Sequence, residues 1–153
     1  ITGVEGDFIY YTNKEGLVVS GAFSMLDTEI TKSLTTTDVL AGKELAFAPG
    51  MQGNIAVRKE WGMSSGNMGH IHARVTWSDE SFSDIIEPNK AMQDSYNFMN
   101  LRAGISNDEW MAELYVDNVT DERAEISNNY VFDRERVAVI RPTTVGIRFK
   151  QNF

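Results

Sequence analysis

The sequence predicts an all-β fold, an antiparallel up-and-down meander of about seven strands. Seven stretches alternate apolar and polar side chains with the period of two that an extended strand imposes. The connections between these stretches alternate between short turns of roughly 3–5 residues and long polar segments of roughly 17–25 residues. Both patterns favour consecutive strands that pair with their neighbours in the chain.

The first two strands are predicted over residues 4–12 and 17–25. Residues 13–16 between them read Asn-Lys-Glu-Gly, which is a turn signal because Gly16 accepts the positive φ angle that a tight turn requires. The two strands are therefore expected to form a hairpin.

The third and fourth strands are predicted over residues 54–61 and 69–78, joined by a second short turn. In the third strand, Lys59 interrupts an otherwise apolar face. The fourth strand is the clearest internal one. Its apolar face holds Ile71, Ala73, Val75 and Trp77, and its polar face holds His70, His72, Arg74 and Thr76.

The fifth and sixth strands are predicted over residues 96–105 and 110–118. Arg102 belongs to the polar face of the fifth strand and Glu113 to that of the sixth. The last strand spans residues 144–153, and its apolar face carries Val145, Ile147, Phe149 and Phe153. A strand that crosses a membrane in a barrel needs about 9–11 residues with this alternation, and the last stretch has that length.

The long segments, over residues 26–48, 79–95 and 119–141, are polar and rich in acidic residues. The third is expected to be partly strand near residues 137–140. Strict alternation of short and long connections is typical of outer-membrane barrels, with short periplasmic turns and long extracellular loops. Counted back from its end, the last strand then finishes on the periplasmic side.

Composition excludes several function classes. The formal charge of −8 leaves no basic surface for nucleic-acid phosphates, and the absence of cysteine excludes disulfides, thiol catalysis and Cys-ligated zinc. No apolar run is long enough for a transmembrane helix. The chain starts at Ile1 without a signal peptide and already resembles a strand there, so we expect a piece of a longer protein.

Several separated motifs, in order along the chain, resemble the C-terminal end of the β-barrel of TonB-dependent outer-membrane receptors. The motifs are NLRAGI from Asn100, Trp110, LYVDNVTDERA from Leu114, RPTTVGIRF from Arg141, the terminal Phe153, and GKELAFAP from Gly42. The resemblance covers nearly all of residues 1–153 and is most specific from Tyr96 onward.

The resemblance implies that residues 1–153 are the C-terminal portion of a transmembrane β-barrel of about 22 strands, without the plug domain. It implies energy-coupled uptake of a scarce ligand such as a siderophore, cobalamin or a glycan. Implied partners are outer-membrane lipid, a TonB-type energy transducer contacted through the missing N-terminal region, the barrel-assembly machinery and a small-molecule ligand. It implies no cofactor.

The polar candidates for the barrel lumen are His70, His72, Arg74, Arg102 and Glu113. Two imidazoles on one strand face can ligate a metal, but no third ligand lies nearby, so we expect polar residues of a wet lumen and no metal site. Val145, Ile147, Phe149 and Phe153 are expected to face lipid, with the terminal aromatic as a barrel signal. No acid–base pair or nucleophile motif indicates an enzyme.

An alternative interpretation is a small self-contained β-barrel or a soluble β-sheet binding module. The odd number of predicted strands argues against a closed bacterial barrel, because those barrels have an even number of strands.

Overall fold

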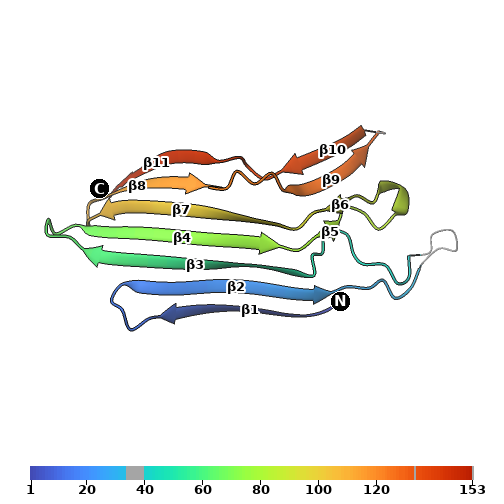
Figure 1. Ribbon diagram of the computed structural model, residues 1–153, viewed down its shortest axis with the longest axis horizontal. Coiled ribbons are helices and arrows are strands. Elements are labelled where there is room, and N and C mark those ends of the chain that lie inside the picture. The colour runs from blue at the N-terminus through green and yellow to red at the C-terminus, as the bar shows by residue number, and fades with distance from the viewer. Residues whose placement is uncertain (34–39, 133, 153) are drawn as a thin grey trace.

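The computed structural model describes residues 1–33, 40–132 and 134–152, and its main feature is one antiparallel sheet of seven strands (Figure 1). The strand order follows the chain, which confirms the predicted all-β meander. The seven strands are β1 (Thr2–Tyr11), β2 (Leu17–Asp27), β3 (Met51–Gly62), β4 (Met68–Ser78), β7 (Tyr96–Ser106), β8 (Trp110–Asp117) and β11 (Thr144–Gln151). Strand β11 pairs with β8, and β1 and β11 form the two edges.

The short turns lie at one end of the sheet and the long connections at the other (Figure 1). The second long connection contains the strands β5 (Ser81–Phe82) and β6 (Met92–Gln93) around a 3₁₀ turn, η1 (Glu87–Asn89). The third contains a hairpin of β9 (Glu125–Val131) and β10 (Arg134–Val139). Strand β10 lies near the predicted strand, whereas β9 was not predicted because its polar run Ser127–Asn129 hides any alternation. Within the described ranges, no helix is long and apolar enough to cross a membrane.

Each strand of the sheet turns its side chains to two faces, and cross-strand neighbours share a face. The six pairings of the sheet contain no register shift in the described part of the chain, so the two faces stay separate from β1 to β11. We call the side of Val19, Val57, Ala73, Leu101, Val116 and Val145 the apolar face, and the side of Ser20, Arg58, His72, Arg102 and Tyr115 the polar face.

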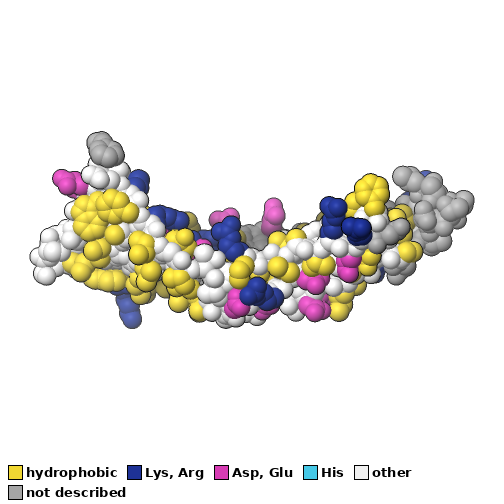
Figure 2. Space-filling view, turned by 90° about the horizontal axis from the view of Figure 1, so that it is seen from above, with side chains coloured by type: hydrophobic (Ala, Val, Ile, Leu, Met, Phe, Trp, Pro, Cys, Tyr) yellow, Lys and Arg dark blue, Asp and Glu magenta, His cyan; other side chains and the backbone are white. Residues whose placement is uncertain are grey.

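The sheet has no conventional hydrophobic core. Among the described residues, the only buried hydrophobic side chains are Ala56 and Ala124. Large apolar side chains are instead exposed, among them Ile147 with 78% of its surface accessible. Figure 2 shows a bowed layer whose hydrophobic side chains gather over the half with the short turns. An apolar face of this extent needs a nonaqueous partner, because exposing it to water is unfavourable.

Lys59 is the exception on the apolar face, where it lies opposite Leu17 and Ile71. Its ammonium reaches the end of the sheet and donates a hydrogen bond to the backbone carbonyl of Glu15 in the first short turn. A long lysine stem can follow an apolar surface while its charge finds a polar partner, so the interruption in the sequence pattern does not break the face.

Glycines on the apolar face lie under aromatic rings. A Cβ atom at Gly53 would lie 2.6 Å from Cζ2 of Trp77, its direct neighbour on β4. Phe8 covers Gly21 in the same way on β2. Because glycine leaves the strand without a side chain to pack, the ring of the neighbouring strand fills that place.

Asn118 ties together the two ends of the third long connection. Its side chain is almost fully buried, with 3% exposed. Its Nδ2 donates to the backbone carbonyls of Glu122 and Arg141, both at 2.9 Å, and its Oδ1 accepts from the Glu122 N–H at 2.9 Å. The hydroxyl of Thr143 donates to the Asn118 carbonyl at 2.7 Å. The chain therefore leaves β8 and returns to β11 at one point.

Asp121 strengthens this tie from the solvent side. Its carboxylate accepts hydrogen bonds from the Thr143 N–H at 3.0 Å and from Arg123 at 3.0 Å. The Thr143 bond first, and the Arg123 bond second, lower the pKa of Asp121 below its ordinary value. The Asp121–Arg123 pair thus acts as an anchor at the strand end.

Replacing Asn118 with Ala removes both Nδ2 bonds at a residue whose φ is +52°, a left-handed conformation that alanine adopts less readily than asparagine does. We expect the free energy of unfolding to fall by about 2–4 kcal/mol, since buried backbone groups lose partners and the backbone is strained. The measurement is equilibrium unfolding in urea, followed by tryptophan fluorescence.

The Asn118→Gly variant relieves the backbone strain but not the lost bonds, so it should recover only about 1 kcal/mol. Asn129→Ala on the exposed part of β9 is the matched control and should change stability by less than about 0.5 kcal/mol. Equal effects of Asn118→Ala and Asn129→Ala would contradict the tie.

Candidate functional site

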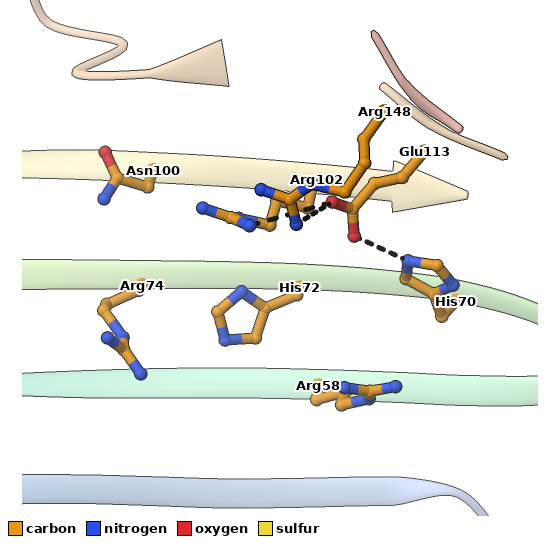
Figure 3. Close-up of a pocket in the computed structure, with 8 residues that line it drawn as sticks. All are labelled: Arg58, His70, His72, Arg74, Asn100, Arg102, Glu113 and Arg148. Carbon is orange, nitrogen blue, oxygen red and sulfur yellow. Dashed lines mark hydrogen bonds and ion pairs between the residues drawn. The ribbon is translucent and has the colours of Figure 1, made fainter. Parts of the chain in front are cut away.

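A cluster of charged side chains on the polar face surrounds an open hollow of about 370 Å³ in the middle of the sheet. The side chains come from five adjacent strands, β3, β4, β7, β8 and β11, and Figure 3 draws them together. The lining residues are Arg58, His70, His72, Arg74, Asn100, Arg102, Glu113 and Arg148.

One row of cross-strand neighbours in the cluster runs over the four strands β4, β7, β8 and β11. Its residues, in that order, are His70, Gly104, Glu113 and Arg148. Gly104 carries no side chain, and a Cβ there would lie 2.6 Å from Cε1 of His70. The imidazole therefore lies over Gly104 and reaches across β7 to Glu113. His70 and Glu113 are both buried, with 7% and 8% of their surfaces exposed.

Glu113 is the centre of the ion pairs. Its Oε2 lies 3.1 Å from Nε2 of His70, and its Oε1 accepts a hydrogen bond from Nη1 of Arg148 at 3.2 Å (Figure 3). Nη1 of Arg102 lies 3.7 Å from the same Oε1. A nearly buried carboxylate is stable only when it is paired, and here three groups from three different strands supply that compensation.

The next row places Arg58, His72 and Arg102 side by side on β3, β4 and β7. Arg58 donates to Glu60 on its own strand, with Nε 3.0 Å from Oε1. Arg102 also lies 3.6 Å from Oδ1 of Asp117, which has no hydrogen-bond partner among the described residues. The two guanidiniums thus lie on either side of His72, and each has a carboxylate next to it, Glu60 for Arg58 and Asp117 for Arg102.

The structure brings together all five polar candidates from the sequence, His70, His72, Arg74, Arg102 and Glu113. It adds three residues that were not selected, Arg58, Asn100 and Arg148. Each lies on the polar half of its strand alternation, but only the register shows that they share one hollow with the others. Val145, Ile147 and Phe149 lie exposed on the apolar face, and Phe153 lies outside the described residues.

The two histidines do not act as a pair. His70 is engaged with Glu113, and His72 lies between Arg58 and Arg102. Over the ranges that the structure describes, no three His, Cys, Asp or Glu side chains are grouped so that they could hold a metal ion. The arrangement is a network of cations around one buried carboxylate.

The sequence matches no protein-family model and no curated protein. The fold matches solved structures. The ferric yersiniabactin uptake receptor FyuA from Yersinia pestis is similar over 99% of this chain with a TM-score of 0.83 and 18% identity. The siderophore receptor PiuA from Acinetobacter baumannii is similar over 96% of this chain with a TM-score of 0.69 and 16% identity.

The chain has the fold of part of the β-barrel of TonB-dependent receptors. It spans 23% of the length of the FyuA chain and 20% of that of PiuA. In this barrel section, the meander of seven strands corresponds to neighbouring strands of a larger closed sheet, and the polar hollow lies on one wall of it.

Replacing Glu113 with Gln keeps the side-chain shape but removes the charge that His70, Arg102 and Arg148 share. We expect the free energy of unfolding of the full-length protein to fall by about 1.5–3 kcal/mol, because the hydrogen bonds lost are charge-assisted. Urea unfolding of the folded protein measures this loss.

Glu60→Gln is the matched control. Its side chain is 43% exposed and, among the described residues, pairs with Arg58 alone, so the loss should stay below about 1 kcal/mol. If the two variants unfold at the same urea concentration, Glu113 is not the centre of the network.

Proposed function

We propose that this chain is the C-terminal portion of the barrel domain of a TonB-dependent outer-membrane receptor that takes up a scarce ligand, a siderophore, cobalamin or a glycan. The observation that carries the proposal is the likeness to the FyuA barrel over 99% of the chain. These two structures are receptors by name, a ferric yersiniabactin uptake receptor and a siderophore receptor. Nothing in the proposed role requires a catalytic step.

The distribution of side chains supports a location in the bacterial outer membrane. Strands of outer-membrane barrels alternate apolar side chains toward lipid with polar side chains toward the lumen. Val145, Ile147 and Phe149 are all more than half exposed on the apolar face, so in the proposal they contact lipid. The residues around Glu113 then face the lumen.

The proposal includes two protein partners. A TonB-type energy transducer would act through a region N-terminal to Ile1, and the barrel-assembly machinery would recognise the C-terminal strand with Phe153. The residue after β11 is held in place by the third short turn, because the backbone N–H of Asn152 donates to the Glu109 carbonyl at 2.8 Å.

The alternative of a small self-contained barrel is less well supported. In the described part of the chain, β1 and β11 lie at opposite edges of an open sheet and do not pair with each other. A soluble sheet module would need another partner for the apolar face, and the exposed Ile147 and Phe149 show that this chain supplies none among its described residues.

Uptake measurements test the transport proposal. Cells with the full-length gene and an intact energy transducer should accumulate one member of a panel of labelled ferric siderophores, cobalamin and oligosaccharides. Accumulation should be lost when either the gene or the transducer is deleted, since uptake against a gradient needs coupled energy. A full-length protein that fractionates outside the outer membrane would contradict the proposal.

Replacing Ile147 with Arg tests the lipid assignment. An arginine facing the bilayer centre destabilises a barrel by about 2–4 kcal/mol, so less protein should reach the folded, heat-modifiable form in outer membranes. Ser20→Arg, on the polar face of β2, is the control and should fold normally. Normal folding of Ile147→Arg would show that the apolar face does not contact lipid.

A further inference from the structure

Lys59 places a positive charge on the apolar face of the sheet. Its direct neighbours across the strands are Leu17 on β2 and Ile71 on β4. In the described strands of the sheet, the only other charged residue on this face is Asp27, at the opposite end of β2 beside the first long connection. A charge among apolar side chains is costly unless it finds a partner, so the position of Lys59 calls for one.

The ammonium of Lys59 is held at the end of the sheet that carries the short turns. It donates a hydrogen bond to the backbone carbonyl of Glu15, in the turn between β1 and β2. The N–H of Glu60 donates to the Gly16 carbonyl at 2.8 Å, so the pairing of β2 with β3 continues into this turn. Glu15 is therefore level with Trp61 on β3. The lysine stem follows the apolar face, and its charge ends one row nearer to the edge of the sheet.

Trp61 marks this level of the apolar face. Its ring lies over Gly69 of β4, where a Cβ atom would be 2.6 Å from Cε2, and 40% of the residue is exposed. Aromatic side chains of membrane barrels gather where the hydrocarbon of the bilayer meets the lipid headgroups. With the apolar face in contact with lipid, as proposed above, the Lys59 ammonium lies at the level of the headgroups.

The positive charge of Lys59 is not neutralised within the described part of the chain. The Glu15 carbonyl is a neutral acceptor for one of three N–H donors, and no described carboxylate forms an ion pair with the ammonium. The other strands of a closed barrel cannot change this, because β3 lies between β2 and β4, which are themselves flanked by β1 and β7. A domain inside the barrel would meet the polar face instead. The lipid side of β3 is therefore already complete in this section.

We propose that Lys59 binds the phosphate of an anionic phospholipid, of the phosphatidylglycerol type, in the periplasmic leaflet of the outer membrane. This inference rests on the proposed function, which turns the apolar face to lipid and the short turns to the periplasm. The phosphate accepts charge-assisted hydrogen bonds from the ammonium, and the acyl chains of the same lipid lie along Leu17 and Ile71. A zwitterionic lipid carries its own cation next to the phosphate, which competes with Lys59, so the anionic lipid is preferred.

Fluorescence quenching of Trp61 measures this preference. The full-length protein is placed in phosphatidylcholine nanodiscs that contain brominated phosphatidylglycerol or, in a second series, brominated phosphatidylcholine at the same fraction. Bromine quenches a tryptophan that the lipid touches, and subtracting the signal of the Trp61→Phe variant isolates Trp61. We expect phosphatidylglycerol to be favoured next to Trp61 by about fivefold, the scale of one lysine at an anionic lipid surface.

Variants of Lys59 identify the charge responsible. Lys59→Gln should lose the preference, whereas Lys59→Arg should keep it because the positive charge remains. Lys90→Gln, in the second long connection at the other end of the sheet, is the matched control and should behave as the wild type does. Sodium chloride at about 1 M should weaken the preference of the wild type by screening, a measurement that needs no variant. An unchanged preference in Lys59→Gln overturns the proposal.

The same measurement separates failure of this inference from failure of the proposed function. If both brominated lipids quench Trp61 equally in the wild type, the apolar face contacts lipid but Lys59 selects no headgroup, and only the phospholipid site is overturned. If neither lipid quenches Trp61, the apolar face does not contact lipid, and the barrel assignment fails together with the site.

Discussion

The structure depends on the unbroken register of six antiparallel pairings. A shift of one residue in any pairing would turn all the side chains of a strand to the opposite face. The hairpin of β9 and β10 contains such an irregularity between Ala138 and Val139, but the seven-stranded sheet contains none in its described residues. Because the sheet is a single layer, the register alone keeps apolar and charged side chains apart.

The same register builds the polar hollow. Glu113 is held by groups on β4, β7 and β11, and no two of its partners lie on the same strand. The buried pair with His70 spans a whole strand, which is possible because Gly104 leaves the place between them empty. A larger side chain at Gly104 would separate the imidazole from the carboxylate. The network can therefore form only when the four strands β4, β7, β8 and β11 pair in the correct register.

Much of the fold was predictable from the sequence, whereas the site was predictable only in part. Period-two alternation places Arg102 and Glu113 on polar halves of their strands without knowledge of any neighbour. It does not reveal which residue of one strand lies opposite which residue of the next. Arg58 and Arg148 were therefore passed over, although both join the cluster once β3 and β11 are in register. Strand β9 was missed because its pairing depends on β10 rather than on its own pattern.

The motif around Asn118 has a physical explanation in the way that β8 ends. The asparagine occupies a left-handed backbone conformation at the end of β8, with φ of +52°. An asparagine tolerates this conformation better than most residues, and its amide can donate and accept hydrogen bonds at the same time. One side chain thereby forms hydrogen bonds with both ends of a connection of more than twenty residues. The Arg-Pro-Thr-Thr stretch takes part in the same hydrogen bonds. Arg141 supplies a carbonyl that accepts from the Asn118 amide, and the Thr143 hydroxyl donates to the Asn118 carbonyl. Pro142 lies outside the hydrogen-bond ladder of the sheet, where its missing N–H costs nothing. The Asn118 N–H also bonds Asn100, so the tie that ends β8 orients a side chain at the hollow. The third long connection and the polar hollow are thus linked through two asparagines on adjacent strands.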